Sequence, residues 1–112
     1  MARAVDVQAL VRDLNEVLIL AVLQDDAKHG YQIALDVEER SGGTFSFQHG
    51  TLYPILHRME KEGRIEGTWS TAEGRRRKEY HPTRRGRAWL AEQEDRLREV
   101  FGTLFALLEE GR

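Results

Sequence analysis

Hydrophobic residues recur at helical spacing in four separate stretches of the chain. The spacing predicts a first helix over about residues 7–24, a second over about residues 30–40 and a third over about residues 48–62. A last, long helix is predicted over about residues 84–110. The later half of the first stretch is apolar nearly all round, which is typical of a helix buried on several sides. The chain is therefore expected to be mainly α-helical.

Glycine and capping residues mark the expected ends of these helices. Residues 41–43, Ser-Gly-Gly, end the second helix and Gly63 ends the third, because glycine tolerates the left-handed conformation that follows a helix. Thr83 is a suitable N-cap for the last helix. Pro54 is harmless only in the first turn of a helix, so we expect a kink or an irregular start in the third helix.

Two short strands are predicted between the third and the last helix. Residues 65–69 and 78–81 form these strands, and the polar segment 70–77 is the expected loop of a hairpin. Residues 25–28 are expected to form a loop, and residues 45–47 a short extended segment. Three helices followed by a two-stranded wing is the order of a winged helix-turn-helix. The predicted fold class is mostly α with a small β-hairpin wing: a winged helix-turn-helix plus a long C-terminal helix.

Net charge alone argues against a nucleic-acid partner, but its distribution does not. The whole chain carries a formal charge of −2. Residues 58–87 hold ten Lys or Arg against five Asp or Glu, a net charge of +5, and the rest of the chain carries −7. Such segregation is typical of a nucleic-acid-binding surface. An ordinary solvated surface with segregated signs is the alternative.

Several classes of protein are disfavoured by what the sequence lacks. It has no cysteine, which excludes disulfides, thiolate zinc sites and a cysteine nucleophile. The four histidines share no metal-ligand spacing, and the chain has no glycine-rich phosphate loop or nucleophile elbow. The longest apolar run, residues 17–23, is far shorter than the roughly 20 residues of a membrane span. We therefore expect a cytoplasmic protein that is not an enzyme and needs no cofactor or metal.

The third helix has the pattern of a helix that reads DNA. Its apolar residues fall on one side, and small, polar or basic residues face the other, which suits insertion into the major groove. A plain amphipathic surface helix is the alternative. The candidate DNA-binding residues of this helix are Gln48, His49, Thr51, Tyr53, Pro54, His57, Arg58 and Lys61.

The densest positive charge lies in the predicted hairpin loop. Arg75, Arg76, Arg77 and Lys78 are consecutive, and at a hairpin tip such side chains reach phosphates or the minor groove. A charge run is often only solvated, but this one follows directly after the candidate DNA-reading helix. We therefore predict that these four residues contact DNA.

The last helix carries an apolar stripe that a lone, solvent-facing helix would not have. It must bury against its own body or against a second copy of the chain. We predict a two-fold dimer built on this helix, with a contribution from the first. Residues 1–82 are then the DNA-binding domain, and residues 83–112 a dimerisation helix packed with the N-terminal helix. The predicted interface residues are Leu97, Val100, Phe101, Leu104, Phe105 and Leu108.

Several motifs together resemble the PadR family of transcriptional regulators. They are His-Gly-Tyr-Gln-Ile at residues 29–33, the segment from Gly-Thr-Leu-Tyr-Pro to Glu-Gly at residues 50–63, and Gly-Arg-Arg-Arg-Lys-Glu-Tyr at residues 74–80. Thr83 and Gly86 continue the family's closing pattern. The resemblance covers roughly residues 14–90 and is far more specific than a generic helix-turn-helix.

The resemblance implies a winged-helix DNA-binding domain, a C-terminal dimerisation helix and a repressor that responds to small molecules. It places the DNA contacts in the third helix and the wing. In some members an aromatic residue of the last helix stacks on the ligand, and Leu97 occupies that region here.

The expected function is that of a homodimeric repressor that binds double-stranded DNA, with a small aromatic or drug-like effector relieving its affinity. The alternative is a winged-helix module for protein–protein contact that binds no operator.

Overall fold

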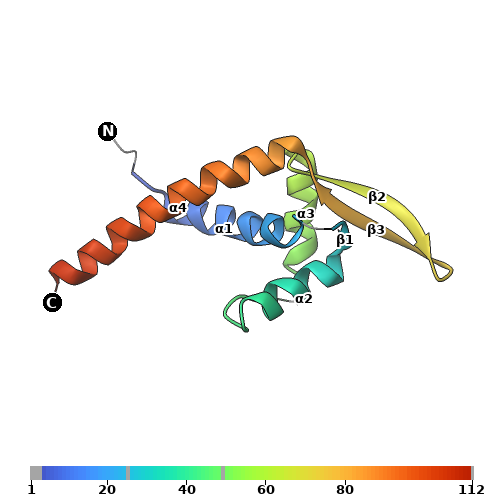
Figure 1. Cartoon of the computed structure of the whole chain (residues 1–112), viewed down its shortest axis with the longest axis horizontal. Helices are drawn as coiled ribbons and strands as arrows, with labels where there is room; N and C mark the ends of the chain where they lie inside the picture. The colour runs from blue at the N-terminus through green and yellow to red at the C-terminus, as the bar shows by residue number, and fades with distance from the viewer. Residues whose placement is uncertain (1–3, 25, 49, 112) are drawn as a thin grey trace.

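The computed structural model describes residues 4–24, 26–48 and 50–111. Within these residues the chain forms four helices and one small sheet, and Figure 1 shows their arrangement. The elements in chain order are α1 (Val7–Val22), β1 (Lys28–His29), α2 (Gly30–Arg40), α3 (Leu52–Lys61), β2 (Ile65–Ala72), β3 (Arg75–Pro82) and α4 (Arg84–Glu110).

The helix boundaries follow the sequence pattern closely. The bounds of α2 are those predicted, and α4 begins after its predicted cap. Thr83 caps it by accepting a hydrogen bond from the backbone N–H of Gly86 at 3.0 Å. Asp6 accepts one from the backbone N–H of Gln8 at the start of α1 in the same way. These contacts satisfy N–H groups that have no partner within the helix.

The third helix begins later than predicted, and this explains how Pro54 is tolerated. Gly50, with φ 84°, and Thr51 lie in a turn, and α3 starts at Leu52. Pro54 is thus in the first turn, where its missing N–H would have no helical partner. The irregular start is confirmed.

The sheet is larger than the sequence pattern predicts. Its order is β1-β3-β2, and all neighbouring strands are antiparallel. β2 and β3 pair from Ile65 opposite Pro82 to Ala72 opposite Arg75, so only residues 73–74 form the turn. Both turn residues have positive φ, 54° and 75°, which matches the twist of a tight hairpin. The predicted loop over residues 70–77 was therefore wrong.

One other connection also differs from expectation. Lys28 was expected in a loop, but with His29 it forms β1, opposite Tyr80 and Glu79 of β3. A strand of two residues has no periodicity, so only pairing with a distant strand reveals it. Residues 45–47, expected to form a short extended segment, lie in neither a helix nor a strand. Residue 25 of the expected loop lies outside the described residues.

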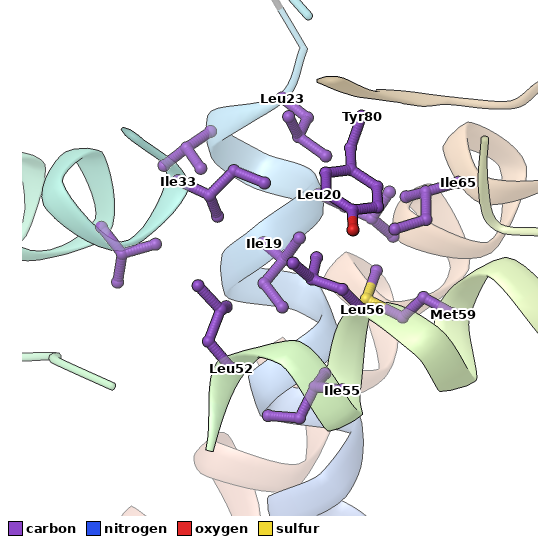
Figure 2. Close-up of a cluster of buried hydrophobic side chains, with 12 residues drawn as sticks. Ile19, Leu20, Leu23, Ile33, Leu52, Ile55, Leu56, Met59, Ile65 and Tyr80 are labelled. Atoms are coloured by element: carbon purple, nitrogen blue, oxygen red, sulfur yellow. The ribbon is translucent and has the colours of Figure 1, made fainter. Parts of the chain in front are cut away.

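The hydrophobic core lies where α1, α2 and α3 meet the base of the hairpin. Figure 2 shows side chains from all three helices converging there, with Tyr80 of β3 and Ile65 of β2 on one side. Each large side chain buried in this way stabilises the fold by about 1.5–3 kcal/mol. Trp89 and Leu90 of α4 pack against the cluster, which joins the long helix to the body.

A buried carboxylate lies beside this core. Glu16 of α1 is 0% exposed, and its Oε1 is 2.6 Å from Nη1 of Arg64, the residue before β2. Its Oε2 is 3.4 Å from Nε of Arg58 on α3. Arg64 also pairs with Glu62, and its guanidinium lies 4.0 Å from the centre of the Trp89 ring on α4. One cluster of charges therefore connects α1, α3, the start of the wing and α4.

The start of α4 packs tightly against the turn that follows α3. The backbone N–H of Thr83 donates to the carbonyl of Arg64 at 3.1 Å, and its hydroxyl donates to the carbonyl of Gly63 at 2.6 Å. A methyl group at Gly86 would overlap that same Arg64 carbonyl. Glycine at this position lets the two backbones come together.

The molecule is elongated, with extents of 59 × 28 × 23 Å. The hairpin of β2 and β3, which we call the wing, projects from one end, and the C-terminal half of α4 projects from the other (Figure 1). Residues 102–111 are exposed along the projecting part of α4. The architecture is the predicted winged helix-turn-helix, and none of the helices in the described ranges is long and apolar enough to cross a membrane.

Replacing Glu16 with Ala should destabilise the fold strongly. The change leaves Arg58 and Arg64 without their buried partner, a loss of about 3–5 kcal/mol in the free energy of unfolding. Urea unfolding followed by circular dichroism measures it. Glu39→Ala, on the exposed side of α2, is the control and should change stability by less than about 0.5 kcal/mol. Equal effects of the two substitutions would contradict the structural role of Glu16.

Two glycines of α4 should respond in opposite directions to the same change. Gly86→Ala forces a methyl group into the Arg64 carbonyl and should cost roughly 1–3 kcal/mol. Gly102→Ala meets nothing within 4 Å and should stabilise the helix by about 0.5–1 kcal/mol. Thermal unfolding of both variants tests this. A neutral Gly86→Ala would show that the two backbones are less tightly packed.

Candidate nucleic-acid interface

The helix α3 divides cleanly into a buried and an exposed face. Its apolar residues Leu52, Ile55, Leu56 and Met59 are buried in the core. Tyr53 is 53% exposed, and the other outward side chains share its face. The predicted orientation of this helix is confirmed. The outward residues are Thr51, which precedes the helix, and Tyr53, Pro54, His57 and Lys61.

Three further residues predicted on this face have different positions. Gln48 is exposed, four residues before α3. His49 lies outside the described residues. Arg58 was expected as a DNA contact at the flank of the exposed face, but it is 37% exposed and its Nε lies 3.4 Å from Oε2 of the buried Glu16. The reason is electrostatic, because a carboxylate buried in α1 needs a cation and Arg58 is within its reach.

The exposed face of α3 continues onto the start of α2. A methyl group at Gly30 would lie 2.8 Å from the hydroxyl of Tyr53, so this glycine lets the hydroxyl end of the tyrosine ring come close to the start of α2. Next to it, the rings of His29 and Tyr31 stack with their centres 6.4 Å apart and their planes at 7°. Sequence reasoning did not assign His29 or Tyr31 to the site. The His-Gly-Tyr motif that contains them was the available signal.

The wing presents three arginines to solvent. Arg75, Arg76 and Arg77 are exposed, but they lie within β3 and not in a loop. The guanidinium of Arg76 is 4.6 Å from the centre of the Trp69 ring, and Nη1 of Arg77 is 3.3 Å from Nε2 of His29. Trp69 is 57% exposed and lies on the wing surface beneath Arg76. Stacking on an aromatic ring restricts the guanidinium.

Lys78, the fourth basic residue of the run, is directed inwards. Its Nζ is 2.9 Å from Oε1 of Glu60 on α3, and its side chain is 24% exposed. The hydrogen bond with Glu60 raises the pKa of Lys78, and burial partly opposes this. In this structure the lysine therefore connects the wing to α3, whereas the three arginines face solvent.

A hollow of about 570 Å³ lies between these elements. Aromatic and basic side chains from the start of α2, from α3 and from the wing line it, so the structure brings helix and wing residues to one side of the body. In the described parts of the chain, no three His, Asp or Glu side chains lie close enough to hold a metal ion. The lining residues are His29, Gly30, Tyr31, Tyr53, His57, Trp69, Arg77, Lys78 and Tyr80.

Sequence comparison relates the chain to bacterial regulators. A model of the transcriptional regulator PadR-like family matches residues 19–92. The transcriptional regulator Rv3488 of Mycobacterium tuberculosis is 35% identical over 92 residues, which cover 79% of this chain and 73% of the relative.

Solved structures agree with this relationship. A PadR family transcription regulator from Clostridium difficile R20291 superposes with a TM-score of 0.74 at 31% identity, covering 84% of this chain and 97% of that one. Bacillus subtilis PadR, solved in complex with operator DNA, superposes with a TM-score of 0.66 at 26% identity. The match to the latter covers 71% of this chain and 45% of that protein.

The matched segment begins in α1 and ends in α4, so it includes the core, α3 and the wing. It spans well over half of the chain. From the fold, the exposed face of α3 and this match, we conclude that the chain belongs to the PadR-like family and is a transcriptional regulator, not an enzyme.

Proposed function

We propose that the chain is a homodimeric, sequence-specific DNA-binding repressor whose affinity for DNA is lowered by a small-molecule effector. The observation that carries the proposal is that Tyr53 and His57 of α3 lie around one hollow with Trp69 and Arg77 of the wing. The operator complex of the Bacillus subtilis relative supports the same use of this fold.

In this proposal α3 enters the major groove and the wing lies along the backbone. Thr51, Tyr53 and His57 are outward and near the start of α3, where side chains reach base edges. Lys61 and Gln48 are exposed at either end of this face and add phosphate or base contacts. Arginine fits phosphate with two parallel hydrogen bonds, so Arg75–Arg77 supply affinity more than specificity.

The exposed apolar stripe of α4 supports a dimer. Leu104, Phe105 and Leu108 are exposed on the part of α4 that projects beyond the body. Leu97, Val100 and Phe101 are half-buried and continue the stripe towards the core. Several large apolar residues in one exposed row are typical of an interface. We propose a second copy of the chain as the partner, because a two-fold dimer presents two α3 helices to two half-sites.

The effector is proposed to bind between α1 and α4. A hollow of about 690 Å³ lies there, with walls that include Val17 and Ala21 of α1 and Leu90, Leu97 and Phe101 of α4. Its mostly apolar lining suits a small aromatic or drug-like molecule. Two of its residues, Leu97 and Phe101, also belong to the proposed dimer stripe. A ligand there would favour one arrangement of the dimer, and thereby one spacing of the two α3 helices.

Removing the charge of two wing arginines should weaken DNA binding for all sequences. Fluorescence anisotropy with duplexes from the region upstream of the protein's own gene measures affinity as a function of salt. Arg76→Ala with Arg77→Ala should reduce the slope of log K against log salt by about 1.8, because each phosphate that a side chain neutralises adds roughly 0.9 to it. His57→Ala should instead change the preference between sequences. Wild-type affinity that is undetectable at low salt would contradict operator binding and favour a protein–protein module.

A charge within the apolar stripe should separate the dimer. Leu104→Glu with Phe105→Glu places two carboxylates in the proposed interface, where an unpaired charge costs several kcal/mol. Analytical ultracentrifugation should then show a monomer with reduced affinity for a two-half-site duplex. Ala106→Glu, on the opposite face of α4, is the control and should remain dimeric. A wild-type protein that sediments as a monomer would overturn the dimer.

A further inference from the structure

The contact between the wing and α3 depends on Lys78 more than on the arginines that precede it. Nζ of Lys78 donates a hydrogen bond to Oε1 of Glu60 at 2.9 Å, and each of the two side chains is only about one-quarter exposed. Ser70, by contrast, bonds to Glu79 within the wing itself. The Glu60–Lys78 pair thus links the hairpin to the helix proposed to read DNA.

A glycine in β2 makes room for this link. Gly67 pairs with Tyr80 and Trp69 with Lys78, so the lysine must pass diagonally across β2 to reach α3. A methyl group at Gly67 would overlap Cε of Lys78 and lie 3.2 Å from Oε2 of Glu60. The lysine stem therefore lies directly on the glycine backbone, in a path that any other residue would obstruct.

Two aromatic rings lie near the ammonium group of Lys78, on the same face of the hairpin. Nζ of Lys78 is 5.6 Å from the centre of the Tyr80 ring and 6.0 Å from that of Trp69. A cation at this distance from a ring face is attracted by it. The hydrogen bond with Glu60 raises the pKa of Lys78, so the ammonium stays charged to well above neutral pH.

The Glu60–Lys78 pair lies closer to the body than the wing arginines do, so it influences where those arginines lie. Arg75–Arg77 lie between Lys78 and the turn, on the part of the wing that extends away from the helices (Figure 1). A strand rises about 3.3 Å per residue, so Arg75 lies roughly 10 Å beyond Lys78. A small change in the wing angle at Lys78 therefore becomes a larger displacement of the arginines.

We propose that Glu60 and Lys78 form a clamp that sets the position of the wing relative to α3, and that Lys78 is a positioning residue and not a phosphate contact. This inference rests on the proposed DNA-binding function. It reverses the usual expectation for an acidic residue close to DNA, because Glu60 then favours binding by holding the wing in place.

The sharpest test of this proposal removes the negative charge of Glu60. Electrostatics alone predicts that Glu60→Gln tightens DNA binding, since it deletes an anion near the phosphates. If the Glu60–Lys78 pair positions the wing, Glu60→Gln should weaken DNA binding instead. Glu73→Gln deletes the same charge at the wing turn, where the side chain is exposed, and is the matched control. It should bind DNA as tightly as the wild type or slightly more tightly.

The experiment measures the affinity and salt slope of each full-length variant by fluorescence anisotropy, with a duplex from the region upstream of the protein's own gene. Glu60→Gln and Lys78→Met should each weaken binding roughly three- to tenfold, the range expected for a coupled pair. Their salt slopes should stay at the wild-type value. The exchanged variant, Glu60→Lys with Lys78→Glu, restores the pair and should recover affinity to within about threefold.

Three results would overturn the clamp. The first is a slope lowered by about 0.9 in Lys78→Met together with tighter binding by Glu60→Gln, which makes Lys78 a phosphate contact. The second is that Glu60→Gln and Lys78→Met unfold more easily than the wild type but bind DNA with unchanged affinity. The third is that the exchanged variant binds DNA no more tightly than Lys78→Met does.

Failure of the proposed function is distinguishable from failure of the clamp. If the wild type shows no salt-dependent affinity for any duplex, the proposed function fails. The clamp is then judged by a double-mutant cycle of urea unfolding on Glu60→Gln and Lys78→Met. Coupling clearly above zero supports a link between wing and helix, and coupling within error of zero overturns it.

Discussion

The buried carboxylate of Glu16 is the contact on which the arrangement of the other elements depends. A carboxylate fully removed from water is costly unless cations and hydrogen bonds compensate it. Arg64 and Arg58 supply that compensation, and Arg64 also stacks on Trp89. Since these residues come from α1, α3, α4 and the start of the wing, satisfying one charge restricts the relative positions of four elements. Glu16 thus joins the candidate DNA-reading helix to the long C-terminal helix.

Pairing with carboxylates also takes three basic residues of the 58–87 segment out of the exposed surface. Arg58, Arg64 and Lys78 are held by Glu16 or Glu60 in the body, so their positive charges are largely compensated. The arginines of β3 face solvent at the far end of the wing. The field available to a polyanion therefore comes from these arginines and from the other exposed basic residues of the segment, which are Lys61, Arg84, Arg85 and Arg87, in a molecule whose overall charge is slightly negative.

The elongated shape separates two kinds of surface. Polar, aromatic and basic side chains gather around the hollow near the wing, and large apolar side chains line the projecting half of α4 at the other end. The body between them is closely packed at the start of α4, where the Thr83 and Gly86 contacts set the point at which α4 leaves the wing. Under the proposed function, movement of α4 against α1 would be transmitted to α3 through this packed body.

The sequence by itself determined the four helices, the wing and the inward and outward faces of α3, because apolar periodicity, capping and glycine stops act within a few residues. Only the tertiary structure decided β1, the extent of the hairpin and the directions of Arg58 and Lys78. The buried partner of Arg64 lies 48 residues away, at Glu16. No local pattern marks which of many charged residues is turned inwards, since that choice depends on which carboxylate the fold buries.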